Sequence, residues 1–141
     1  MACVEQNYKS KISNSKQISI TKIQNHKPYD LEDRTLEFGK RIIRLCQALP
    51  KNSVNFKLMD QLVRSGTSVG ANYREANETE TKKDFLFRLR IARKEGKETI
   101  YWLNLIIEAN TCLADRIKPL VDETGELVKI LATIIEKSKA K

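Results

Sequence analysis

The sequence predicts an all-α protein, an antiparallel up-down-up-down four-helix bundle preceded by a flexible N-terminal arm. Apolar residues recur at alternating spacings of three and four in four stretches that are joined by short links. No strand-plus-turn pattern competes with this pattern in the bundle region. The chain has 141 residues, 40% of them hydrophobic and 31% charged, which suits one compact core. We expect a boundary between an arm at residues 1–27 and a bundle at residues 28–141.

The arm is rich in Ser, Lys, Asn and Gln, and its isoleucines are scattered. Such a segment buries too little apolar surface to offset the conformational entropy that ordering would cost. It also carries five Lys against the single acid Glu5. We therefore expect a flexible, basic arm that adds positive charge beside any bound polyanion.

The first helix is expected from Asp30 to Leu49. Asp30 can accept hydrogen bonds from the first free N–H groups, and Pro50 ends the helix. The apolar face is the set of residues spaced by four and three: Leu31, Thr35, Phe38, Ile42, Leu45 and Leu49.

The second helix is expected from Ser53 to about Ala76, and it contains the segment RSGTSVGANYREAN at residues 64–77. A Walker-type phosphate loop needs Lys and then Ser or Thr after its last Gly, and a dinucleotide loop needs a preceding strand; the segment has neither. A turn is the alternative, because each Gly costs a helix roughly 1 kcal/mol relative to Ala. The apolar stripe nevertheless continues. We expect one continuous or slightly bent helix, with Gly66 and Gly70 where another backbone comes close.

A polar stripe lies about 100° from the apolar face of this helix. Its residues are Arg64, Ser68, Asn72 and Glu75. One interpretation is a solvated helix face. The other is a hydrogen-bonded seam between helices or subunits, in which a buried Arg and Glu would need each other. Because the apolar face already points to the core, a second contact face favours an oligomer.

The third and fourth helices complete the bundle. Thr81 and Asp84 resemble a capping box, and the third helix is expected to reach Ala109. Its apolar stripe is Phe85, Leu89, Ala92, Gly96, Thr99, Leu103 and Ile106. The fourth helix is expected to begin between Ile117 and Pro119. Its apolar stripe is Leu120, Thr124, Leu127, Leu131 and Ile134.

The net charge of +8 and the pI near 9.5 favour a polyanionic partner, RNA more than DNA. The cations cluster in the first half of the third helix, and spacings of seven, four and three place most of them on one face. The candidate nucleic-acid-binding residues are Lys83, Arg90, Arg93, Lys94 and Lys97. The alternative is a solvated basic face.

Catalysis, metals and cofactors find no support in the sequence. His26 stands alone in the arm, and the three cysteines lack CxxC spacing, so no zinc site or disulfide framework is indicated. We expect Cys46 and Cys112 to pack as small apolar residues. We expect Tyr101 and its neighbour Trp102 to pack in the core or a subunit interface. No apolar run is long enough to span a membrane, and a cytoplasmic location fits.

Two motifs carry a family resemblance that covers about residues 30–136. They are QLVRSGTSVGANYREAN at residues 61–77 and KKDFLFRLRIARKEGKETIYWL at residues 82–103. The first resembles the pattern of Arg, small residues, Ser-Val and Ala-Asn in bacterial four-helix-bundle proteins named for reading frames in intervening sequences of 23S rRNA genes, also called S23 ribosomal proteins. The second resembles the helix that follows in those proteins.

The resemblance implies a ring-shaped homo-oligomer, a pentamer, with a basic surface, nucleic-acid binding and no enzymatic activity. Similar proteins act as accessory subunits of retroelement reverse transcriptases. The chain departs from the family at Tyr73, Arg74, Asn77 and Lys97, where Ile, Ala, Gly and Ser are more usual. The alternative function is an oligomeric scaffold that recruits a protein partner such as a reverse transcriptase.

Overall fold

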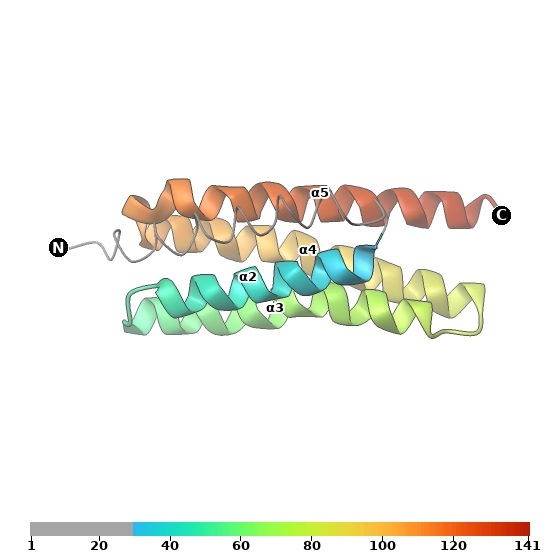
Figure 1. Ribbon diagram of the computed structural model, residues 1–141, viewed down its shortest axis with the longest axis horizontal. Helices are drawn as coiled ribbons and strands as arrows, with labels where there is room; N and C mark the ends of the chain where they lie inside the picture. Colours follow the sequence, from blue (N-terminus) through green and yellow to red (C-terminus); the bar gives the residue numbers. More distant parts are fainter. Residues whose placement is uncertain (1–29) are drawn as a thin grey trace.

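The computed structural model describes residues 30–141, and the arm expected at residues 1–27 lies outside that range. Its elements in chain order are α2 (Leu31–Ala48), α3 (Ser53–Asn77), α4 (Lys82–Ala109), the short 3₁₀ helix η1 (Thr111–Leu113) and α5 (Ala114–Lys139). Consecutive long helices run in opposite directions (Figure 1). Residues 30–141 contain no strand, so the predicted all-α up-down-up-down bundle is confirmed.

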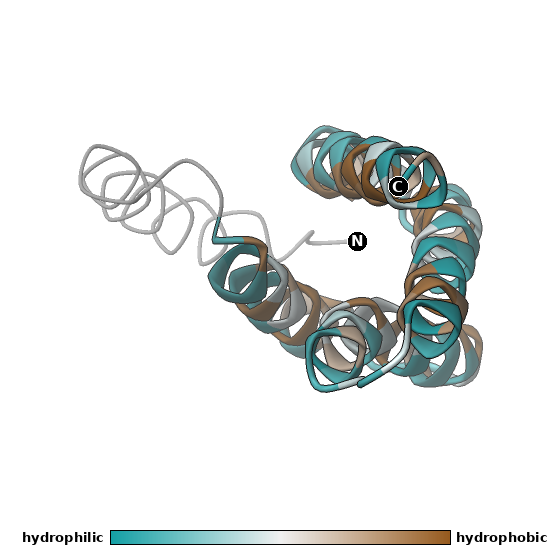
Figure 2. Ribbon diagram, turned by 90° about the vertical axis from the view of Figure 1, so that its right-hand side faces the viewer, coloured by the Kyte–Doolittle hydropathy of each residue, from teal (hydrophilic) through white to brown (hydrophobic). Residues whose placement is uncertain are grey.

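The four long helices lie on an arc from α2 through α3 and α4 to α5 when they are viewed end-on (Figure 2). Sequential neighbours make most of the helix contacts, with α3 and α4 the most extensive pair, whereas α2 and α5 contact each other much less. An ion pair spans the α2–α5 side, where Arg34 Nη2 lies 2.7 Å from Glu123 Oε1. Because α3 and α4 are the middle helices of the arc, no other described helix covers their outer faces (Figure 2).

The core forms where the predicted apolar stripes meet inside the arc, and nearly all of the predicted positions are buried. Two positions differ by one residue. Leu86 is buried where Phe85 was expected and Phe85 is only partly so, while Ile135 is fully buried and Ile134 only partly so. Each difference lies near an end of its helix, within five residues of the start of α4 or the end of α5.

The helix starts follow the predicted caps. The Asp33 N–H donates to Asp30 Oδ1 at 3.2 Å, and the Asp84 N–H donates to Thr81 Oγ1 at 3.1 Å. α3 begins after Asn52, whose side chain accepts from the Asn55 N–H at 2.9 Å. The predicted boundaries of α2, α3 and α4 therefore hold to within a residue or two.

The glycine-containing segment is helical throughout, as predicted, and Gly66 and Gly70 both face α2. A Cβ added to Gly70 would lie 2.9 Å from Thr35 Oγ1, and one added to Gly66 would lie 3.0 Å from Ile42 Cγ1. Both distances are shorter than ordinary carbon contacts. The two glycines thus allow α2 and α3 to pack closely, and the turn is excluded.

The predicted start of the last helix is wrong. α5 begins at Ala114, directly after η1, and Pro119 lies inside it. A proline inside a helix removes one backbone hydrogen bond. Burial of Ile117 and Leu120 on either side offsets that loss, since they are 0% and 4% exposed. The proline is therefore not a boundary here.

Candidate nucleic-acid interface

One face of α4 is exposed along the length of the helix. Its residues follow spacings of four and three without interruption, and at about 100° per residue they form a single stripe. The stripe consists of Lys83, Phe87, Arg90, Lys94, Lys97, Tyr101, Asn104 and Glu108. We call it the outer stripe of α4. The fold produces it because α3 and α5 cover the two flanks of α4 and leave this face open.

Four of the five predicted cations lie in the outer stripe: Lys83, Arg90, Lys94 and Lys97. The prediction that these four share one exposed face is confirmed. The fifth, Arg93, is partly buried on the flank toward α5. The pKa of Glu136 on α5 is lowered chiefly by a hydrogen bond from Lys139 and by its charge, with smaller contributions from Arg93 and Arg90. Arg93 therefore borders the stripe on its α5 side.

The side chains of the five cations make no ion pair and no hydrogen bond with any residue in the described range 30–141. The arginines of α2 and α3 contrast with them, because every one is paired with a carboxylate. Those arginines are Arg34, Arg41, Arg44, Arg64 and Arg74. The cations of the outer stripe of α4 thus form no ion pair within the described range, and the exposed Lys40 of α2 and Lys57 of α3 share this property.

Two aromatic side chains flank the cations in the outer stripe. Phe87 is 56% exposed and Tyr101 is 57% exposed. Tyr101 does not pack in the core, because it lies on the face of α4 opposite the core, and its expected place in a subunit interface stays a prediction. Phe87 was not predicted as a site residue, although its place in the repeat of four and three with the cations was a usable signal.

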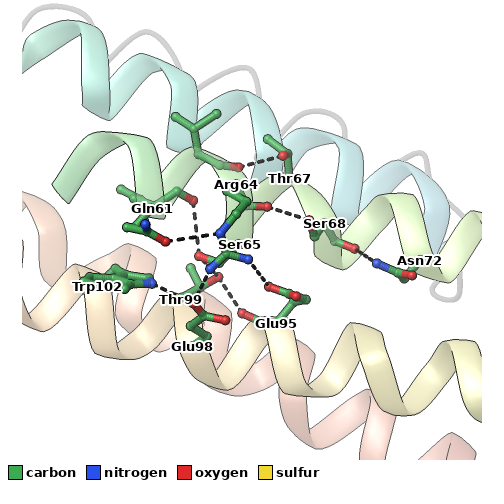
Figure 3. A network of polar contacts seen from close by, with 12 residues as sticks. Gln61, Arg64, Ser65, Thr67, Ser68, Asn72, Glu95, Glu98, Thr99 and Trp102 are labelled. Atoms are coloured by element: carbon green, nitrogen blue, oxygen red, sulfur yellow. Dashed lines mark hydrogen bonds and ion pairs between the residues drawn. The ribbon is translucent and has the colours of Figure 1, made fainter. Parts of the chain in front are cut away.

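Tyr101 is oriented by its neighbour. Its ring meets the Trp102 ring edge-on, with centroids 5.0 Å apart and an interplanar angle of 71°. Trp102 is partly buried, and its Nε1–H donates to Glu98 Oε1 at 3.1 Å. Figure 3 shows Trp102 and Glu98 beside Arg64 of α3. The orientation of Tyr101 therefore depends on a hydrogen bond within the same helix.

The polar stripe of α3 forms part of a seam with α4. Arg64 Nη1 lies 3.2 Å from Glu95 Oε2, and Arg64 Nη2 pairs with Glu98. Within one chain Arg64 does not pair with Glu75 of its own helix, and a pairing of the two between subunits stays a prediction. Eleven residues of helix separate them by about 16 Å, whereas the acids of α4 lie directly opposite.

The other members of the stripe differ in what they contact. Ser68 Oγ donates to the Arg64 carbonyl oxygen of its own helix at 2.6 Å. Asn72 Oδ1 accepts from Arg88 Nη1 of α4 at 3.4 Å. Glu75 is exposed and makes no ion pair with a described residue. Arg64 and Asn72 thus belong to a seam between helices, and Ser68 and Glu75 do not.

Residues 30–141 contain no group of three or more His, Cys, Asp or Glu side chains arranged for a metal ion. None of the helices described is both long and apolar enough to cross a membrane. Cys46 is partly buried, whereas Cys112 is exposed in η1. His26 lies outside the described residues.

The fold and the outer stripe together define a small helical-bundle protein with one cationic helix face flanked by aromatics. The chain belongs to the family described as 23S rRNA-intervening sequence protein, whose profile matches residues 28–133. This confirms the family resemblance read from the motifs.

A solved structure supports the same assignment. It has a TM-score of 0.68 and 38% sequence identity to this chain, and the match covers 74% of this chain and 96% of the other. It is the crystal structure of a protein with unknown function from the S23 ribosomal protein family of Bacteroides thetaiotaomicron VPI-5482. No match was found among curated proteins.

Proposed function

We propose that this chain is a non-enzymatic, cytoplasmic nucleic-acid-binding protein that contacts the backbone phosphates of RNA. The contacts come from the five cations on and beside the outer stripe of α4. The observation that supports this most directly is that none of the five is paired within residues 30–141, while every arginine of α2 and α3 is. Unpaired cations are free to displace the counterions of a polyanion, which is the main source of such affinity.

The proposal includes a homo-oligomer, a pentamer. Repetition of the outer stripe around a ring would let one RNA touch several subunits and gain from effective concentration. Leu36 and Ile43 support a protein contact, because they are 46% and 43% exposed and lie two helical turns apart on α2. Burial of these two side chains against a second copy would remove their apolar surface from water.

The RNA proposal is tested by the double substitution Arg90→Glu with Lys94→Glu, titrated against RNA at several salt concentrations. The matched control is Lys40→Glu with Lys57→Glu, because these lysines are exposed and unpaired but lie on α2 and α3. We expect the α4 variant to bind more weakly, with the salt slope reduced by about 0.7 to 0.9 for each lost phosphate contact. The control should change much less.

Two outcomes would contradict this localisation. Equal loss in both variants would mean that only the net charge matters. Unaltered affinity and slope in the α4 variant would place the contact elsewhere, most reasonably in the N-terminal arm. Circular dichroism and light scattering on each variant would first establish unchanged helicity and mass.

The oligomer is tested separately by light scattering at micromolar concentration. We expect a mass of several subunits, and we expect Asn72→Ala or Glu75→Ala to lower it if the polar stripe also contacts a second copy. A monomeric wild-type protein would contradict the oligomer. An oligomer that shows no salt-dependent retention on heparin or RNA would favour the scaffold that recruits a partner such as a reverse transcriptase.

A further inference from the structure

We propose that the outer stripe of α4 selects single-stranded RNA, with unpaired bases stacking on Phe87 and Tyr101. This inference rests on the proposed function and adds a substrate class to it. Backbone contacts alone do not distinguish a duplex from a single strand, whereas exposed aromatic rings do, because the base faces of a duplex are already stacked.

The geometry of the stripe suits a strand laid along the helix. Phe87 and Tyr101 are fourteen residues apart, which corresponds to about 21 Å along the helix axis. Between them lie the cations Arg90, Lys94 and Lys97, all exposed. Non-specific single-strand sites combine such a cationic track for the backbone with aromatic platforms for successive bases. The two rings therefore mark the ends of a platform that spans a few nucleotides.

The charge of the stripe favours a polyanion over a second copy of the chain. From Lys83 to Tyr101 the stripe contains no carboxylate, and the first acid is Glu108 at its far end. The cores of protein interfaces are depleted of charged residues. A protein contact centred on these aromatics would have to cover three unpaired cations between them, whereas an RNA strand offers a phosphate for each.

The Tyr101 ring is oriented before RNA binds. Trp102 contacts the Tyr101 ring edge-on, and Glu98 holds the Trp102 indole by a 3.1 Å hydrogen bond. Glu98 in turn pairs with Arg64 of α3 (Figure 3). A ring that loses little freedom on binding gives more net affinity. Trp102 is the protein's single tryptophan, so its fluorescence reports on this site.

The experiment uses Phe87→Leu with Tyr101→Leu in the full chain. Leucine keeps the apolar bulk and the helix propensity but removes the aromatic face. The control is Phe56→Leu, because Phe56 is 50% exposed on α3, away from the stripe. Each protein is titrated with a 15-nucleotide oligouridine and with an RNA duplex of the same length, and Trp102 fluorescence is followed.

We expect the double variant to bind oligouridine about 5- to 150-fold more weakly for each stacked base lost. Its duplex affinity and its salt slope should be unchanged. RNA should quench Trp102 fluorescence in the wild type and less in Tyr101→Leu. Phe56→Leu should match the wild type throughout.

Three results would overturn the inference. If Arg90→Glu with Lys94→Glu weakens binding but the leucine variant binds both RNAs normally, the proposed function stands and base stacking fails. If the leucine variant instead loses oligomer mass in light scattering, the aromatics contact a second copy. If the wild type binds neither RNA, both proposals fail together.

Discussion

Asn55 and Asn110 form a buried reciprocal amide pair that ties the first turn of α3 to the end of α4. Asn55 Nδ2 donates to Asn110 Oδ1 at 3.0 Å, and Asn110 Nδ2 donates to Asn55 Oδ1 at 2.9 Å. Each amide also donates to a backbone carbonyl, that of Pro50 at 2.8 Å and that of Ile106 at 2.9 Å. Both N–H groups of each side-chain amide are thereby used, and each amide oxygen accepts one hydrogen bond, at the end of the bundle.

Replacement of Asn55 by Ala should lower the free energy of unfolding by about 1 to 3 kcal/mol, because it leaves the buried Asn110 amide without its partner. Urea denaturation measures this. The control is Asn104→Ala on the exposed stripe of α4, which should change stability by no more than about 0.5 kcal/mol. Equal effects of the two substitutions would mean that the pair contributes nothing specific.

Gly70 and Gly125 should respond oppositely to alanine. At Gly70 the new Cβ would lie 2.9 Å from Thr35 Oγ1 and 3.4 Å from the Thr35 carbonyl carbon, whereas at Gly125 nothing lies within 4 Å. We expect Gly70→Ala to destabilise by about 1 to 3 kcal/mol through overpacking. Gly125→Ala should stabilise by up to about 1 kcal/mol through helix propensity. Thermal unfolding of both variants checks this, and a stabilised Gly70→Ala would show that α2 can move away.

The Arg64–Glu98 pair should be weakly coupled. The Arg64 side chain is 46% exposed, and exposed pairs are largely screened by solvent. A double-mutant cycle with Arg64→Met and Glu98→Gln should give a coupling energy of at most about 1 kcal/mol. The coupling should fall further in high salt. A coupling of several kcal/mol would indicate that the pair is shielded in solution, as it would be in a subunit interface.

Cys46 should make stability decline at alkaline pH. Burial raises the pKa of the Cys46 thiol to about 11. The folded protein therefore holds this proton more tightly than the unfolded chain, whose thiol has a pKa of about 8.5. The resulting stability is complete below that value and is lost as the pH rises through about 11. Urea midpoints from pH 8 to 11 should fall more steeply in the wild type than in Cys46→Ala. Parallel curves would contradict this.

The outer stripe of α4 was only partly predictable. The spacing of Lys83, Arg90, Lys94 and Lys97 placed them together because they belong to one helix, whose period is known. The sequence did not reveal that they are unpaired, since that depends on which acids the neighbouring helices bring near. The exposure of Tyr101, which was expected in the core or in a subunit interface, was not predictable for the same reason, since it depends on which neighbouring helix covers that face of α4.

The sequence by itself determined the helices, their buried faces and the starts of α2, α3 and α4. Caps such as Asp30 and Thr81 act within one turn, and the apolar stripes follow from the helical period alone, so both are local. The tertiary structure alone decided the partners. Arg64 meets Glu98 instead of Glu75, and Gly70 meets Thr35, because these contacts join residues about 35 positions apart. Such contacts depend on the axial register of two packed helices, and that register is set by the fit of the whole core.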